Sequence, residues 1–172
     1  IGRCFEEAFL KAWASLEQGA PHPRPLTRAD ESEGEGMAER AFEQLPDNVL
    51  IDWLRIATDR RMGAVIEAFR RGWSIERVHE ITRITRWFLY GFQRIANVEN
   101  EIVARACSPR DLTADELRKW KSFGFSDGHI ADALSGFPTT GLKELAESKS
   151  EQAVMKARHG HSVHPIFRMV DS

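Results

Sequence analysis

Three histidines near the end of the sequence could bind a metal ion through their ring nitrogens. His159, His161 and His164 lie close together in the stretch HGHSVHP. A zinc site needs ligands that converge on one point and further side chains that orient them. A loop with glycine and proline near the end of the chain does not supply this geometry, so we favour a solvated loop over a metal site.

Neighbouring carboxylates could carry out general acid–base chemistry, and the sequence offers Glu6 with Glu7 and Asp30 with Glu31. A general base must lie within hydrogen-bond reach of the proton that it removes. Adjacent side chains on a helix point in different directions, and carboxylates in a polar linker mainly serve solubility. Glycine patterns that bind phosphate and the common hydrolase motifs are missing from the sequence. We therefore predict no catalytic residue, no bound cofactor and no metal ligand in this chain.

The densest charged region is a group of arginines that could bind nucleic acid: Arg60, Arg61, Arg70, Arg71, Arg77, Arg83, Arg86 and Arg94. A DNA-reading helix presents Asn, Gln or Arg from its first turns, whereas the helix expected after Ser74 opens with Ile-Glu-Arg. A duplex-binding domain also carries excess positive charge, and this chain has a net charge of −2. We expect ion pairs inside the protein instead, with acidic partners among Asp59, Glu67, Glu76 and Glu80.

The composition is that of an ordinary globular protein that folds as one domain or two small ones. The chain has 172 residues, of which 42% are hydrophobic and 29% are charged. Cys4 and Cys107 form no C-x-x-C motif, so we expect a reducing compartment. No apolar run approaches the length of about 18 residues that a membrane span requires. The sequence begins with Ile inside a helical pattern, so we expect it to be a piece of a longer chain.

Helices must position all these residues. Apolar residues recur at spacings of three and four, and the alternation typical of strands is absent, so we predict an all-α, multihelical fold. The spacing predicts helices over 3–18, over 37–57 with a break at Pro46, and from Thr58 to Gly72. Cap residues predict further helices after Ser74, Thr85, Thr113 (with a capping box to Glu116), Ser126 and Ser150.

The helix after Thr85 carries apolar side chains that we expect to form one buried stripe: Phe88, Phe92, Ile95, Val98, Ile102 and Ala106. We place Trp87 in the core as well. The best domain boundary is the stretch 20–36, which has three prolines and almost no large apolar residue. Such a composition cannot bury enough surface to fold, so we predict a flexible linker.

A weak internal repeat relates GWSIERVHEI (72–81) to GFSDGHIADA (124–133), which align without gaps. In both, Gly suits a left-handed helix end, the next aromatic residue can fold back onto that helix, and Ser can cap the following helix. A motif used twice indicates a structural joint between helices rather than DNA recognition. It also leaves open two similar small helical subdomains.

The helix that ends before Thr58 has an apolar face wider than one core contact needs. Leu50 and Leu54 lie beside the stripe formed by Val49 and Trp53. Extra exposed apolar surface commonly marks an association site. We therefore predict that Leu50, Trp53 and Leu54 contribute to self-association or domain packing. The alternative is that this face is buried between subdomains.

Four stretches, in order, resemble the middle of the large subunit of carbamoyl-phosphate synthetase. They are IGRCFEEAFLKAWASLE, DRR…EAFRRGWSIERVHEITRITRWFL, LRKWKSFGFSDGHIA and HPIFRMVDS. The resemblance covers nearly the whole chain outside 20–45 and 136–149. Thr85 stands where that family usually has Asp, and Arg168 stands where it usually has Lys.

The resemblance implies a domain order along the chain. Residues 1–19 would be the last helix of the carboxyphosphate-forming ATP-grasp half, followed by the linker at 20–36. Residues 37–165 would be the helical oligomerisation domain, and 166–172 would begin the connection to the carbamoyl-phosphate-forming half. This segment would itself be non-catalytic and would link the two halves of the enzyme.

The resemblance also implies what surrounds the segment. The parent uses ATP and Mg²⁺ to make carbamoyl phosphate from bicarbonate and ammonia (from glutamine), for arginine and pyrimidine biosynthesis. The implied partners are the flanking ATP-grasp halves, further copies of the chain in a homo-oligomer, and a glutaminase small subunit. No nucleic acid or membrane is implied, and the location is cytoplasmic, with an organelle left open. The alternatives are a free-standing helical interaction protein and, less favoured, a helix-turn-helix nucleic-acid binder.

Overall fold

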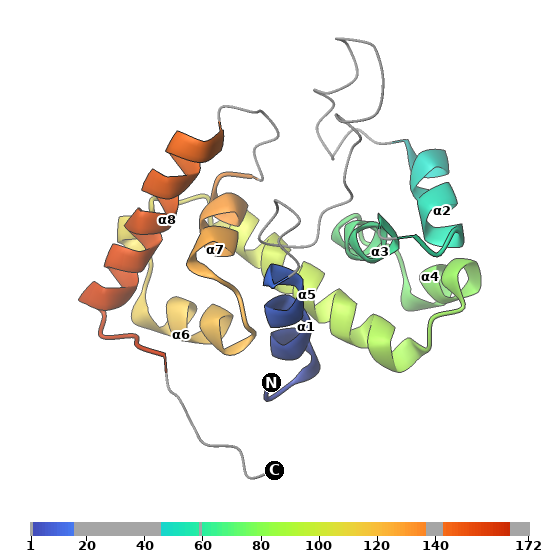
Figure 1. The fold of residues 1–172 in the computed structure, drawn as a ribbon, viewed down its shortest axis with the longest axis horizontal. Helices are drawn as coiled ribbons and strands as arrows, with labels where there is room; N and C mark the ends of the chain where they lie inside the picture. Colours follow the sequence, from blue (N-terminus) through green and yellow to red (C-terminus); the bar gives the residue numbers. More distant parts are fainter. Residues whose placement is uncertain (1, 16–45, 59, 137–142, 166–172) are drawn as a thin grey trace.

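Every regular element that the structure describes is helical, so the all-α prediction is confirmed. The structure is a computed structural model, and it describes residues 2–15, 46–58, 60–136 and 143–165. Figure 1 shows the longest helix, α5 (Arg86–Arg105), crossing the middle of the molecule. The predicted linker at 20–36, the expected start of the domain at 37 and the stretch 166–172 lie outside the described residues.

Two groups of helices pack on α5. The first helix group consists of α2 (Asp47–Arg55), α3 (Arg60–Arg70) and α4 (Ile75–Thr82). The second helix group consists of α6 (Ala114–Ser122), α7 (Asp127–Leu134) and α8 (Lys143–Gly160), with a short 3₁₀ turn, η2 (Pro109–Asp111), before α6. The remaining helix, α1 (Phe5–Ala14), lies against α5 between the two groups (Figure 1).

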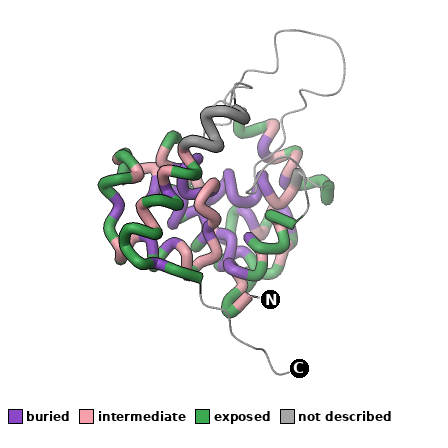
Figure 2. Tube along the Cα trace, turned by 60° about the vertical axis from the view of Figure 1, so that its left-hand side comes forward, coloured by how far each residue is buried: buried purple, intermediate pink, exposed green. Residues whose placement is uncertain are grey.

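One hydrophobic core runs through both groups, and Figure 2 shows its buried residues along the inside of the molecule. Its largest fully buried aromatic side chains are Trp120 and Phe125, in the second helix group. Each fully buried apolar side chain of this size contributes about 1.5–3 kcal/mol to folding. The stripe predicted on α5 is buried at Phe92, Ile95, Val98 and Ile102.

Two members of that predicted stripe are not in the core. Ala106 follows the last turn of α5 with a φ of 41°, so the helix has already ended there. Phe88 is 44% exposed, and Trp87, also predicted to be buried, is 63% exposed. The core placement of these residues was therefore wrong, because the first turn of α5 extends beyond the helices that cover the rest of it.

The two predicted joints, at 72–74 and 124–126, have the same backbone geometry. Gly72 and Gly124 have φ values of +77° and +95°, which only glycine adopts without strain. The amide N–H groups of Trp73 and Phe125 reach back to the carbonyls of Ala68 and Trp120, at 3.0 and 3.3 Å. The amide N–H of each Gly donates a second hydrogen bond to the preceding helix. The two bonds together form a Schellman motif, which ends the helix.

The predicted caps are mostly confirmed. The hydroxyls of Ser74 and Ser126 accept hydrogen bonds from the backbones of Arg77 and His129, at 3.2 and 3.0 Å. Thr113 and Glu116 form the expected capping box. Thr85 precedes α5 but makes no side-chain cap. The helix predicted to begin after Ser150 begins earlier, at Lys143, so that boundary was wrong.

Candidate functional site

The neighbouring carboxylates of α1 are held by cations rather than aimed at a common point. Glu7 accepts hydrogen bonds from the ammonium of Lys11 and from the backbone N–H of Arg3, both at 2.8 Å, and from the guanidinium of Arg3 at 3.1 Å. These contacts lower the pKa of its carboxyl to about 2. Glu6, also buried, pairs with Arg94 of α5. Glu6 therefore ties α1 to α5. Glu7, with so low a pKa, is a poor proton acceptor.

The candidate metal ligands His159, His161 and His164 are exposed at the end of α8 and in the turn that follows. The rings of His159 and His164 lie 5.8 Å apart, centroid to centroid. In the parts of the chain that the structure describes, no three histidine, cysteine or acidic side chains converge as metal ligands would.

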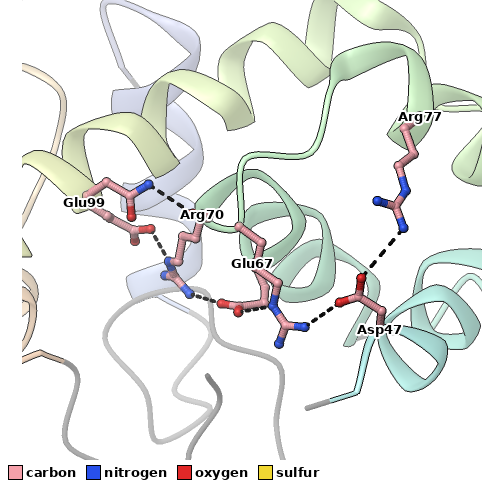
Figure 3. Close-up of polar contacts among 7 residues, drawn as sticks. Asp47, Glu67, Arg70, Arg77 and Glu99 are labelled. Atoms are coloured by element: carbon pink, nitrogen blue, oxygen red, sulfur yellow. Dashed lines mark hydrogen bonds and ion pairs between the residues drawn. The ribbon is translucent and has the colours of Figure 1, made fainter. Parts of the chain in front are cut away.

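Four of the predicted arginines, Arg70, Arg71, Arg77 and Arg94, form ion pairs, and Glu67 is one of the predicted acidic partners. Arg71 contacts Glu67 at 2.8 Å and Asp47 of α2 at 3.0 Å. Arg77 approaches the same Asp47 at 3.8 Å, so a chain of charges crosses the first helix group (Figure 3). Asp59 lies outside the described residues. The prediction was wrong for Glu76 and Glu80, which lie exposed on α4 and make no ion pair within the described residues.

The chain of charges continues to the centre of the molecule through Arg70 and Glu99. Arg70, at the end of α3, places Nε 2.6 Å from Oε2 of Glu99 on α5 and Nη1 3.3 Å from Glu67. Glu99 is completely buried, and its other oxygen lies 2.8 Å from Nε2 of His129 on α7. The side chain of Asn100 also donates to the backbone oxygen of Arg70 at 3.2 Å. One buried carboxylate thus contacts both helix groups.

The charges in this network are fixed by their surroundings. Burial alone would raise the pKa of Glu99, but the charge of Arg70 and the hydrogen bond from His129 lower it to about 2. Burial lowers the pKa of His129, although Glu99 opposes this shift. Glu99 is therefore ionised and His129 neutral near pH 7, with the Nε2–H of His129 donating to Glu99. The sequence predicted ion pairs for these arginines, but not that Glu99 or His129 takes part.

Two of the three residues predicted to form an association surface are in the core. Leu50 and Leu54 are fully buried beneath α3 and α4, whereas Trp53 is half-buried and packs against the core. Burial among these helices accounts for the wide apolar face of α2. A role for these residues in self-association stays a prediction, and only Trp53 presents surface to another molecule.

The largest exposed apolar side chains gather elsewhere, on the first two turns of α5. Trp87, Phe88 and Tyr90, called the aromatic surface below, are 63%, 44% and 50% exposed. Phe5 of α1 packs against two of them, with ring centroids 5.7 Å from Trp87 and 5.8 Å from Phe88. Sequence reasoning missed this surface. A usable signal was that Trp87 and Tyr90 share a helix face with the polar residues Arg94, Asn97 and Glu101.

Phe5 needs a glycine opposite it on α5. A Cβ atom at Gly91 would overlap the ring of Phe5, so the missing side chain lets α1 lie close to α5. Phe5 also contacts Phe92 edge to face, at a centroid distance of 5.2 Å. Aromatic pairs of this kind stabilise a contact beyond simple burial. The aromatic surface therefore stands on a firmly held helix pair.

No helix among the described residues is long and apolar enough to cross a membrane. The interactions that the described residues do show are apolar packing and ion pairing. The two features built from these interactions are the central charge network around Glu99 and the aromatic surface on α5.

Comparison with known proteins gives consistent matches. Residues 1–162 match the family described as the carbamoyl-phosphate synthetase large chain, oligomerisation domain. The chain is 34% identical over its full length to the carbamoyl phosphate synthase large chain, N-terminal section, of Aquifex aeolicus. It is 32% identical over 92% of its length to the carbamoyl phosphate synthase arginine-specific large chain of Halalkalibacterium halodurans. It spans 25% and 13% of the lengths of these two relatives.

Proposed function

Because the chain belongs to the family of the carbamoyl-phosphate synthetase large chain oligomerisation domain, we propose that it is a non-catalytic spacer and association segment of such an enzyme. In this role it links the carboxyphosphate-forming half to the carbamoyl-phosphate-forming half. It also joins large chains into oligomers. We assign it no catalytic residue, and the ATP and Mg²⁺ sites belong to the flanking halves.

The proposed parent makes carbamoyl phosphate from bicarbonate, ammonia and ATP in the cytoplasm. A glutaminase small subunit supplies the ammonia, and the product serves arginine and pyrimidine biosynthesis. The printed name of one relative, an arginine-specific large chain, supports the first of these pathways. The boundaries at 19, 36 and 165 belong to the same proposal.

One observation supports the spacer role most directly. Glu99 on α5 pairs with Arg70 of the first helix group and with His129 of the second. Because α5 also packs on α1, the helix that would lead in from the preceding half is tied to the same helix as the two groups. A spacer must hold its neighbours at a fixed separation, and buried charge pairs of this kind favour one arrangement of helices.

Sedimentation equilibrium of the 172-residue chain over a wide concentration range tests the association role. We expect a reversible dimer or tetramer. Trp53→Glu is then the variant that tests the interface predicted at Leu50, Trp53 and Leu54, because changes at the two buried leucines would unfold the core. A strict monomer at the highest concentrations would contradict an association surface within this segment and would leave only the spacer role.

A further inference from the structure

The aromatic surface packs against α1 through Phe5, and much of it stays exposed among the described residues. Trp87 and Tyr90 lie on the outward face of α5, and Phe5 supports Trp87 from the side. Trp and Tyr are the side chains most enriched at the centres of protein interfaces. A surface that is already ordered loses little entropy when a partner binds.

Four exposed charged residues in the stretch of chain that leads to this surface make no ion pair in the described part of the protein: Glu76 and Glu80 on α4, Arg83 at the end of α4, and Arg86 at the start of α5. Most arginines of the same region are paired, including Arg70, Arg71, Arg77 and Arg94. Arg86 is the first residue of α5, where the partial positive charge of the helix disfavours a cation. An acidic group from outside would relieve this repulsion.

The charge pattern fits a second copy of the same chain. In a contact with two-fold symmetry the same patch occurs on both sides, so it must carry both members of every complementary pair. The segment 76–90 carries two unpaired acids, two unpaired bases and three exposed aromatic side chains. We propose that two copies associate through this segment, with Glu76 and Glu80 of one copy facing Arg83 and Arg86 of the other, around Trp87 and Tyr90.

The size of the surface predicts a weak contact. An aromatic side chain can bury about 150–250 Å², and the three here retain about half of that for a partner. A standard interface buries about 800 Å² per partner, so aromatic area and charged rim together fall at the low end. Dissociation constants in the micromolar range or weaker, and rising with salt, are expected.

The inference rests on the proposed association role, and a charge-reversal experiment separates the two. One variant carries Glu76→Arg with Glu80→Arg, and the other carries Arg83→Glu with Arg86→Glu. In either variant alone the facing charges become alike, so the dissociation constant measured by sedimentation should rise at least tenfold. In an equimolar mixture every facing pair is again opposite in sign, and association should return to the level of the unchanged chain.

A second pair of variants tests the aromatic centre. Trp87→Ala with Tyr90→Ala should also weaken association at least tenfold. Ile56→Ala is the matched control, because Ile56 is an exposed apolar residue (61%) outside the segment, and it should have no effect. Circular dichroism should show unchanged helix content in all variants.

The outcomes distinguish this inference from the function on which it rests. Association that persists in every variant would show that copies do not meet through this surface, while the association role itself would stand. Weakening in both charge variants without recovery in the mixture would overturn the two-fold pairing. A chain that stays monomeric throughout would overturn the inference and move the partner of the aromatic surface to the flanking synthetase halves.

Discussion

The two helix joints share one backbone geometry but lie in different surroundings. At Gly72 a Cβ atom would meet nothing within 4 Å, whereas at Gly124 it would lie 2.7 Å from Cα of Glu7. Both glycines need a left-handed conformation. Only the second joint must in addition leave room for the backbone of α1. The same local sequence therefore produces the same turn at both joints. The neighbouring helices determine how much stability is lost when the glycine is replaced.

The difference extends to the residue four positions after each aromatic. In the first joint Arg77 lies over the ring of Trp73, 3.4 Å from its centroid, and its head group is exposed near Asp47. At the matching position His129 stacks on Phe125 at 4.4 Å and is buried against Glu99. At this position the first joint has an exposed side chain, Arg77, whereas the second joint has a buried one, His129, which binds Glu99 in the centre of the molecule.

The largest predicted effect comes from breaking the link between the joints. Glu99→Gln removes the charge that lies 2.6 Å from the buried guanidinium of Arg70 and leaves Glu67, at 3.3 Å, as the other carboxylate beside it. We expect the free energy of unfolding, measured by chemical denaturation, to fall by about 3–5 kcal/mol. Asp115→Asn is the control, because its exposed pair with Arg118 contributes about 1 kcal/mol or less. Equal losses in the two variants would show that the central network does not join the helix groups.

The next prediction compares the stability that is lost when each of the two glycines is replaced by alanine. Gly72→Ala should cost about 1–2 kcal/mol, from left-handed strain alone. Gly124→Ala should cost at least about 1 kcal/mol more, because the new methyl group also forces α1 away from the joint. Thermal denaturation of both variants gives the comparison. Losses of the same size would mean that α1 does not rest on the second joint.

Removing the serine caps should have smaller and equal effects. Ser74→Ala and Ser126→Ala each remove one hydrogen bond to the start of a helix, which costs about 1 kcal/mol. Equal losses, measured by urea denaturation, would sharpen the comparison by showing that the joints differ in surroundings and not in the turn itself. A much larger loss at one serine would locate the difference in the turn.

The smallest effect near neutral pH concerns His129. Because burial lowers its pKa, the unfolded chain takes up this proton more readily than the folded protein once the pH falls below 6.5. The free energy of unfolding should therefore decline as the pH falls below that value. Denaturation at a series of pH values measures this slope, and His129→Gln should flatten it. An unchanged slope in that variant would assign the proton to another group.

Glu99 adds a second decline at lower pH. Its contribution is fully present above the ordinary pKa of 4.5 and is lost as the pH falls from there toward about 2. The first joint has no buried titrating residue at the position of His129, so both declines belong to the centre of the molecule and the second joint.

Local signals in the sequence predicted much of this architecture. Gly72, Gly124, Ser74 and Ser126 act on their own neighbours, and the structure places all four as expected. The capping box at Thr113 is equally local. Pattern alone also predicted the ion pairs of Arg70, Arg71, Arg77 and Arg94, but it wrongly extended them to Arg83 and Arg86, which make none among the described residues.

Features that depend on distant contacts were not predictable in the same way. Glu99 looks like one more polar residue of α5, and only the approach of α3 and α7 buries it. The prediction that Trp87 and Phe88 are in the core failed because α1, which reaches both rings through Phe5, leaves about half of their surface exposed. For Leu50 and Leu54, the width of the apolar face was visible, but the packing of α3 and α4 on it was not.

Native-state hydrogen exchange tests most directly whether Glu99 joins the two helix groups into one spacer. The amides of Trp73 and Phe125 report on the two joints, because each makes the long hydrogen bond of its Schellman motif. We predict similar opening free energies for both amides in the unchanged chain and a parallel fall in Glu99→Gln. A fall at one amide while the other keeps its protection would show that the groups open independently, and would contradict the spacer role.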